Sequence, residues 1–347
     1  MPSKSQIPAP QASLRGAFFI PIFACIFAFL SSCDSKETPT NTPDWRSTTP
    51  ASSNQTAKAS AAKKVSASPS AEHLGSPTTF MFYNIRNYLS MPRGPNSAKK
   101  MTSKPEGEIT ALIRHITSVA PDVLAVCEIG TQADLLDLQR RLKSAGHPLP
   151  FSHLHGGSDP YRRLAILSRH PLSPQHKTNE TFKIKGKPHR MLRGILDVTI
   201  QLPSGPARFL GVHLKSKRHS KYWDQAQLRR HEAETLRQHV NNILSASSSS
   251  SDLLIFGDFN DTKQSASIRA IVGAAHTKNH LSALDLKDQH GTRWTHYWAY
   301  QDVYSRFDYI FTSPSMKKRI DKNHSRILTI PPNDPASDHR PLVVEIN

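Results

Sequence analysis

Residues 251–261, Ser-Asp-Leu-Leu-Ile-Phe-Gly-Asp-Phe-Asn-Asp, contain a short apolar run that changes at Gly257 into carboxylate and amide side chains. The apolar half is typical of a buried strand, and Asp258 and Asn260 follow where such a strand would end. A buried strand fixes the groups at its end firmly, as metal binding and phosphate chemistry require. An ordinary strand that leaves for the surface through a polar turn would read the same way, so this segment alone does not decide between the two.

Other strand-like runs also end in or beside polar side chains, and this favours a shared site. The full set is Asn84, Glu128, His213, Asp258, Asn260, Asp308, Asp338 and His339. Carboxylates and amides without cysteine are ligands for hard cations, namely Mg²⁺, Mn²⁺ or Ca²⁺, rather than for structural zinc. The two histidines can transfer protons near neutral pH. Any one of these residues alone is more often a cap or turn residue, but together they indicate metal-assisted chemistry.

Alternating strand and helix patterns would position these groups. Helices are predicted over residues 106–119, 133–144 and 224–244, where apolar residues recur at helical spacing. Strands are predicted over residues 78–86, 122–128, 164–168, 194–200, 208–213, 251–256, 304–311 and 337–346. This order predicts a mixed α/β fold in which helices cover at least one sheet.

The charge of the chain favours a polyanionic partner. Its 347 residues carry a formal net charge of +18, and +15 of this lies in residues 78–347. Nucleic acid and an anionic membrane surface are both consistent with that balance. Cys127 is the single cysteine after residue 33, so this part of the chain cannot form an internal disulfide, and we expect Cys127 to be a small buried hydrophobic residue.

The N-terminal segment is typical of an exported protein. Residues 17–30 are apolar but too short for a comfortable membrane span, which predicts a signal peptide over residues 1–33. The ending Leu-Ser-Ser-Cys33 resembles a bacterial lipobox, so we expect lipidation of Cys33, attachment to the cell envelope and, failing that, secretion. Residues 34–77 are rich in Ser, Thr, Ala and Pro and are predicted to form a disordered tether. We expect the domain that follows, residues 78–347, to act as a monomer.

The polar motifs occur in the order and approximate spacing of the endonuclease/exonuclease/phosphatase superfamily, which the chain resembles over residues 78–347. The motifs are Tyr-Asn84-Ile-Arg, the strand ending at Glu128, Val-His213-Leu-Lys-Ser, Gly-Asp258-Phe-Asn260, Asp308-Tyr-Ile and Ser-Asp338-His339. The histidine at 213 and the Asn-Ile-Arg run are more similar to the pancreatic deoxyribonuclease branch than to the exonuclease branch. The resemblance implies a four-layered αββα sandwich of two mixed sheets with helices outside.

The resemblance also implies a role for each residue in the hydrolysis of a phosphate ester. Glu128, with Asn84 and Asp338, would hold the divalent cation. His339 would deprotonate the attacking water while Asp308 fixes its tautomer. Asp258 and Asn260 would position water and phosphate, and His213 would donate to a phosphate oxygen or to the leaving group.

Two departures from the branch bear on substrate binding. Tyr161, Arg162 and Arg163 stand where pancreatic enzymes carry an acidic residue that orients the acid histidine, so we expect His213 to bind phosphate more than to donate a proton. Glu128 is followed by Ile-Gly and lacks the arginine that contacts DNA in that branch. The candidate substrate-binding residues are Arg193, Arg190, Lys215 and Trp223.

Three functions remain open from the sequence. The first is an envelope-attached or secreted nuclease that hydrolyses phosphodiester bonds in DNA or RNA. The second is a phosphatase or phospholipase of the same fold, of phosphoinositide or sphingomyelin type. The third is a lipoprotein that binds a polyanion without turnover. Residues 293–298, which include two tryptophans, fit either a substrate-facing rim or core aromatics.

Overall fold

The computed structural model describes residues 75–92, 101–175, 178–219, 224–246 and 251–347. These residues belong to Ala67–Asn347, one of two units into which the chain divides. The predicted signal peptide, Cys33, nearly all of the predicted tether, and Trp223 lie outside the described residues. None of the helices among the described residues combines the length and the apolar character needed to cross a bilayer.

Two six-stranded mixed sheets form the centre of the unit, as expected for this fold. The first sheet has the order β17 (Ile320–Ile327), β18 (Leu342–Ile346), β1 (Thr78–Tyr88), β4 (Val123–Ile129), β6 (Arg163–Ser168), β5 (Phe151–His155). The second has the order β13 (Ser282–Ala283), β16 (Asp308–Thr312), β12 (Leu253–Asp258), β11 (Gly205–His213), β10 (Leu196–Leu202), β7 (Leu172–Pro174). Within the first sheet β1 is parallel to β4, and within the second β11 is parallel to β12.

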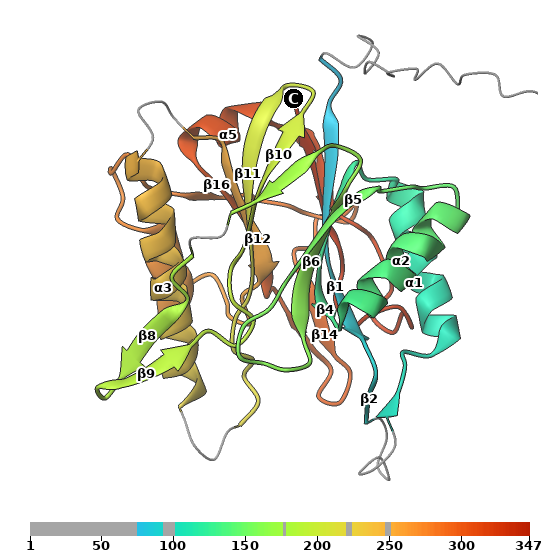
Figure 1. Ribbon diagram of the computed structural model, residues 1–347, viewed down its shortest axis with the longest axis horizontal. Helices are drawn as coiled ribbons and strands as arrows, with labels where there is room; N and C mark the ends of the chain where they lie inside the picture. The colour runs from blue at the N-terminus through green and yellow to red at the C-terminus, as the bar shows by residue number, and fades with distance from the viewer. Residues whose placement is uncertain (1–74, 93–100, 176–177, 220–223, 247–250) are drawn as a thin grey trace, which may run out of the picture. The chain divides into compact units, whose positions relative to one another are not determined.

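Helices cover the outer face of each sheet, which gives the four layers visible from right to left in Figure 1. The helices are α1 (Glu106–Val119), α2 (Gln132–Ser144), α3 (Gln225–Ala246), α4 (Ala266–Val272) and α5 (Pro314–Arg319). The apolar faces of α1 and α2 share one buried cluster with the outer face of the first sheet, and those of α3 and α4 share another with the second sheet. Helical spacing of their apolar residues is what turns each helix toward its sheet.

Aromatic side chains join the inner faces of the two sheets. Phe256 of β12 packs against Phe80 and Phe82 of β1, with ring centroids 5.2 and 5.5 Å apart. These side chains alternate with outward-facing residues along each strand, as the two-residue repeat of a strand requires. Cys127 is buried in the same central cluster, as predicted.

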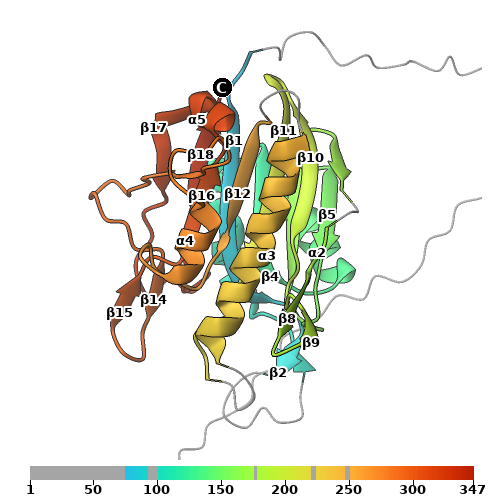
Figure 2. The ribbon, with the colours of Figure 1, turned by 90° about the vertical axis from the view of Figure 1, so that its left-hand side faces the viewer.

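Three small hairpins extend from the sandwich. They are β2 (Met91–Pro92) with β3 (Met101–Thr102), β8 (Thr181–Ile184) with β9 (Lys187–Arg190), and β14 (His296–Trp298) with β15 (Val303–Ser305). Figure 2 shows β14–β15 and β8–β9 at the same end of the sheets, on opposite sides. The single strand predicted over residues 304–311 is wrong, because Tyr304 belongs to β15 and the chain turns before β16 starts at Asp308.

Candidate active site

The polar side chains predicted to share a site come from the ends of neighbouring strands. In the second sheet Asp258 pairs in register with His213 on one side and with Asp308 on the other, so the three lie side by side. In the first sheet Asn84 pairs with Cys127, and Glu128 follows directly. Because both sheets bring these strand ends to one edge of the sandwich, side chains more than 170 positions apart in sequence meet, such as Asn84 and Asp258.

A glycine allows β12 to approach β11 closely. A Cβ atom on Gly257 would lie 2.1 Å from the backbone oxygen of Val212, so a larger residue here would push the strands apart. Asp258 then accepts a hydrogen bond from the backbone N–H of Asn260 at 2.8 Å, and the Asn260 amide donates to the oxygen of Leu214 at 3.1 Å. The Gly-Asp-Phe-Asn motif therefore builds the turn and also fixes the segment that follows His213.

The backbone at the strand ends is unusual. Arg86, Asn87, Glu128 and Asn260 all have positive φ, between 43° and 65°. Residues with a Cβ pay a conformational cost in this region, and they occur there chiefly where surrounding contacts enforce the geometry. The backbone N–H of Asn87 donates to Glu128 Oε2 at 3.0 Å, which is one such contact.

His339 and Asp308 form a buried hydrogen-bonded pair, with His339 Nδ1 2.8 Å from Asp308 Oδ2. The turn that carries His339 is fastened to β1, because Ser337 Oγ donates to the backbone oxygen of Asn84 and accepts from the backbone N–H of His339. Burial disfavours the protonated ring, but the charges of Asp308 and Asp258 outweigh burial and raise the pKa of His339 to about 10. His339 Nε2 faces Asn84 Nδ2 at 3.5 Å and Asp258 Oδ2 at 3.8 Å.

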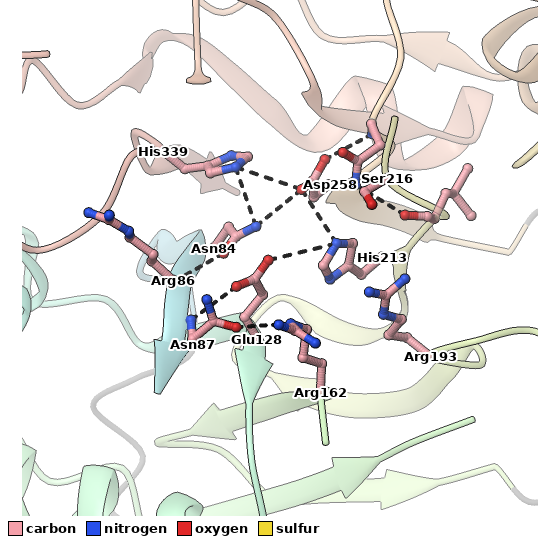
Figure 3. Close-up of polar contacts among 12 residues, drawn as sticks. Asn84, Arg86, Asn87, Glu128, Arg162, Arg193, His213, Ser216, Asp258 and His339 are labelled. Carbon is pink, nitrogen blue, oxygen red and sulfur yellow. Dashed lines mark hydrogen bonds and ion pairs between the residues drawn. The ribbon is translucent and has the colours of Figure 1, made fainter. Parts of the chain in front are cut away.

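His213 has different neighbours, and Figure 3 shows it near Asp258, Glu128 and Arg193. Its Nε2 is 3.6 Å from Asp258 Oδ2 and 3.9 Å from Glu128 Oε1. Its Nδ1 is buried and has no hydrogen-bond partner among the described residues. Burial, together with the charges of Arg193 and His339, lowers the pKa of His213 well below its ordinary value. His213 is therefore a neutral imidazole at pH 7.

Asp258 and Asp308 are buried side by side, an arrangement that fits a divalent cation. Burial and the neighbouring charge of Asp308 raise the pKa of Asp258 to about 7, with a further contribution from Glu128. Asp308 Oδ1 is buried and has no hydrogen-bond partner among the described residues. Asp258, Asp308 and His339 are the one group of three ligand-type residues, within the described part of the chain, whose donor atoms all lie within 4.8 Å of one another.

The predicted metal ligands Glu128, Asn84 and Asp338 lie around the group formed by Asp258, Asp308 and His339. Glu128 is fixed through Oε2 by Asn87 and directs Oε1 toward His213. The Asn84 amide donates to Asp258 Oδ2 at 3.1 Å, and Asn84 Oδ1 accepts from the backbone N–H of Arg86. Asp338 Oδ2 lies 3.9 Å from His296 Nε2 and 4.0 Å from Arg86 Nε.

The predicted substrate-binding residues do not all lie at the site. Arg193 is buried beside His213, with Nε 3.3 Å from Asp159 Oδ2, and its Nη1 has no hydrogen-bond partner among the described residues. Arg190 is instead paired with Glu180, with 3.0 Å between Nη2 and Oε2. The ammonium of Lys215 donates to backbone oxygens of Ser216 and Arg218 within its own loop.

Sequence reasoning missed several residues that support the site. Asp159 lies 3.3 and 3.9 Å from Arg193 and Arg162, and Glu232 accepts hydrogen bonds from the backbone N–H groups of Leu192 and Lys215. Each is an isolated acid in a loop or helix, so no local pattern marks it. Thr295 and His296 lie within residues 293–298, which the sequence left open between a substrate-facing rim and core aromatics.

Comparisons with known proteins agree with this architecture. Residues 81–339 match the model of the Endonuclease/Exonuclease/phosphatase family. No curated protein matches the chain in sequence. The fold is similar to the human Nocturnin catalytic domain with bound sulfate anion, at 18% identity and a TM-score of 0.54, covering 78% of this chain and 94% of that one.

Two further structures share the fold. Truncated TDP2 from Caenorhabditis elegans is 16% identical with a TM-score of 0.52, and the match covers 79% of this chain and 99% of that one. Sphingomyelinase C from Streptomyces griseocarneus is 14% identical with a TM-score of 0.52, covering 78% and 100%. At these identities the likeness shows the fold alone.

Proposed function

Because the chain belongs to the endonuclease/exonuclease/phosphatase family, we propose that it is a divalent-metal-dependent phosphodiesterase that hydrolyses nucleic acid. Members of this family are hydrolases of phosphoester bonds that generally use divalent cations. The observation that carries the proposal is the buried Asp308–His339 pair, which faces Asp258 and Asn84 at the meeting edge of two sheets. A protein that only binds a polyanion does not need a histidine whose tautomer is fixed by a buried carboxylate.

The residues divide the work between proton transfer and phosphate binding. Asp308 accepts the Nδ1 proton of His339, which leaves Nε2 to take a proton from water held near Asp258 and Asn84. His213, a neutral imidazole, donates a hydrogen bond to a phosphate oxygen or to the leaving group. The buried guanidinium of Arg193 adds positive charge on that side, where negative charge accumulates during hydrolysis.

We propose Glu128, Asn84 and Asp338 as the residues that hold the cation, which is Mg²⁺ or else Mn²⁺ or Ca²⁺. A bound cation would neutralise charge on the phosphate oxygens and lower the pKa of His339 toward the range in which it can act as a base. Carboxylate and amide oxygens are suitable ligands for such hard cations. In the alternative group of Asp258, Asp308 and His339, the proposed base already uses the hydrogen bond between Asp308 Oδ2 and His339 Nδ1.

The net charge supports a nucleic acid substrate, since +15 of the charge lies in residues 78–347. The test is hydrolysis by the purified full chain of plasmid DNA, RNA, phospholipid vesicles and a phosphomonoester, each with Mg²⁺ or with EDTA. We expect cleavage of nucleic acid that EDTA abolishes. Hydrolysis of phospholipid but not of nucleic acid would replace the nuclease by a phospholipase.

Glu128→Gln tests the cation assignment in the same assay. We expect this variant to need at least about tenfold more Mg²⁺ for half-maximal rate, since it loses a ligand charge. Asp308→Asn should lose rate while its Mg²⁺ requirement stays close to that of the wild type. The reverse pattern would move the cation to Asp308.

We also propose that Cys33 carries a lipid that attaches the enzyme to the cell envelope. The support is the apolar run and the lipobox-like ending of residues 1–33. Mass spectrometry of the N-terminal peptide, compared between the wild type and Cys33→Ser, measures this directly. A wild-type N-terminal peptide that differs in mass from the Cys33→Ser peptide only by the exchange of sulfur for oxygen would exclude lipidation.

A further inference from the structure

The β14–β15 hairpin carries a group of aromatic side chains that the proposed catalytic chemistry does not use. Trp298, Tyr300 and Tyr304 are 48, 86 and 46% exposed, and they are among the few large hydrophobic residues exposed in the described part of the chain. Figure 2 shows the hairpin reaching outward from the sandwich at the end where the site strands finish. Such a cluster on a surface indicates a binding site.

The base of this hairpin is joined to the proposed catalytic pair. Thr295 Oγ1 accepts hydrogen bonds from the backbone N–H groups of Phe307 and Asp308, both at 3.0 Å. His296 forms an isolated β-bridge with His339, and their ring centroids are 4.6 Å apart. The exposed rings therefore begin only two residues after a residue in contact with His339.

The rings at the base of the hairpin are packed against one another, while Trp298 and Tyr300 near the tip have ring centroids 6.1 Å apart. Tyr304 packs on Tyr297 and on Trp294, with ring centroids 4.6 and 5.0 Å apart, and the guanidinium of Arg340 lies 3.6 Å from the centroid of Trp294. Across the tip, Tyr297 donates from its hydroxyl to Asp302 Oδ1 at 2.9 Å. A ring held in this way loses little conformational entropy when a flat ligand stacks on it.

Cationic side chains lie between the hairpin and the site. The half-exposed Lys217 places its ammonium 5.2 Å from the ring centroid of Phe307, at the base of the hairpin, and 3.2 Å from Asp261 Oδ1. Arg86, also half exposed, lies beside Asp338 on the same side. Across the site, the β8–β9 hairpin exposes Lys183, Lys185 and Lys187. Aromatic rings on one side, with cationic side chains between them and the site, match a nucleic acid strand, which has both bases and phosphates.

From these contacts we infer that β14–β15 is a platform on which bases of single-stranded nucleic acid stack while the backbone passes Lys217 into the site. The inference rests on the proposed nuclease function and names its substrate class. Aromatic platforms combined with a basic path are a general means of holding single strands without sequence preference. A membrane surface fits less well, because Gln301 and Asp302 at the tip would have to leave water for the tip to enter a bilayer, whereas bases can stack on the rings with the tip still solvated.

The test compares two ligands that differ only in their bases: a labelled single-stranded oligodeoxynucleotide and an abasic oligomer of the same length. Trp298→Ala and Tyr300→Ala are made in the full chain, and Kd is measured by fluorescence anisotropy in EDTA, with kcat and KM measured in Mg²⁺. We expect each variant to raise Kd and KM for the base-bearing strand about tenfold. Values for the abasic oligomer and kcat should not change.

Two controls separate stacking from other effects. Tyr300→Phe keeps the ring and should bind like the wild type. Phe151→Ala removes another exposed aromatic side chain, which pairs in register with Ser168 and therefore lies at the end of the sheet opposite Glu128, so it should change nothing.

Several outcomes would overturn the inference. Unchanged Kd and KM for the base-bearing strand in both alanine variants would do so, as would an equal loss for the abasic oligomer. Loss of binding to phosphatidylglycerol vesicles with oligonucleotide binding intact would assign the hairpin to a membrane. If the wild type binds the strand through the hairpin but never cleaves it, the platform stands and the proposed nuclease fails.

Discussion

The two histidines of the site belong to opposite electrostatic regions although both are almost fully buried. His339 has a carboxylate on Nδ1 and a pKa raised to about 10, whereas burial and the charge of Arg193 lower the pKa of His213. His213 ends β11 of the second sheet and His339 lies in the turn before β18 of the first, yet both face Asp258, which lies 3.8 Å from His339 and 3.6 Å from His213. The difference teaches that neighbouring charge, more than burial, decides which histidine can exchange a proton.

Removing His339 should have the largest effect if this comparison is right. His339→Ala should lower kcat about 10³- to 10⁴-fold, because proton transfer loses its base. Steady-state hydrolysis of a labelled oligonucleotide measures the loss. His324→Ala, which removes an exposed histidine on β17, is the matched control and should keep wild-type kcat. A folded His339→Ala enzyme within tenfold of the wild type would show that this ring is not the base.

Removing only the charge beside His339 should come next. Asp308→Asn should lower kcat about 10³-fold, since the ring loses the group that holds its tautomer. The charge of Asp308 raises the pKa of His339, so the acid limb of the pH–rate profile should move to lower pH in this variant. A limb that stays in place would mean that another group titrates there.

Replacing the neutral His213 should lower kcat less than replacing His339, because His213 donates a hydrogen bond and does not take up a proton. His213→Gln keeps a hydrogen-bond donor, so we expect a loss of about 10²-fold in kcat and an unchanged pH–rate profile. Single-turnover rates across the pH range measure both quantities. Disappearance of one limb of the profile would show that His213 carries a proton during turnover, contrary to its setting.

Stability should respond to pH in opposite directions at the two rings, and this is the smallest effect. In EDTA the raised pKa of His339 adds stability that is complete below about pH 6.5 and is lost as pH rises toward 10. His213 has a lowered pKa, so the folded state resists a proton that the unfolded chain accepts, and stability falls as pH drops below about 6.5.

Urea unfolding of His339→Gln and His213→Gln across this range separates the two contributions. The first variant should lose the alkaline decline and the second should lose the acidic one, at slopes of up to about 1.4 kcal/mol per pH unit. Identical pH dependence in both variants and the wild type would refute the comparison.

The sequence predicted the helices and strands whose apolar residues repeat at regular spacing and pack into the core. The helix predicted over residues 106–119 has those bounds, and the strands ending near Glu128, His213 and Asp258 were placed to within three residues. Apolar spacing carries that information because these elements face a core. The meeting of Asn84 with Asp258 depends on how two sheets pack, so it followed from resemblance and not from local pattern.

Other parts of the site leave no mark in the sequence. The hairpins β8–β9 and β14–β15 lack long apolar repeats, and the break between Tyr304 and Asp308 is set by the hydrogen bonds to Thr295. The pKa of His213 depends on the charge of Arg193, twenty positions earlier, and Arg193 in turn forms an ion pair with Asp159. A charged side chain can act on another residue without a fixed separation between the two in the sequence. Such pairs therefore cannot be predicted from sequence spacing.

Each sheet supplies only half of the proposed chemistry, and Phe256 with Phe80 and Phe82 keeps the halves in contact. Catalysis therefore depends on the packing between the two sheets. A shift of one sheet relative to the other would abolish activity, although each sheet would keep its own hydrogen bonds. Activity should thus be lost at a lower denaturant concentration than the far-ultraviolet circular dichroism signal, because the active site is disrupted before the secondary structure.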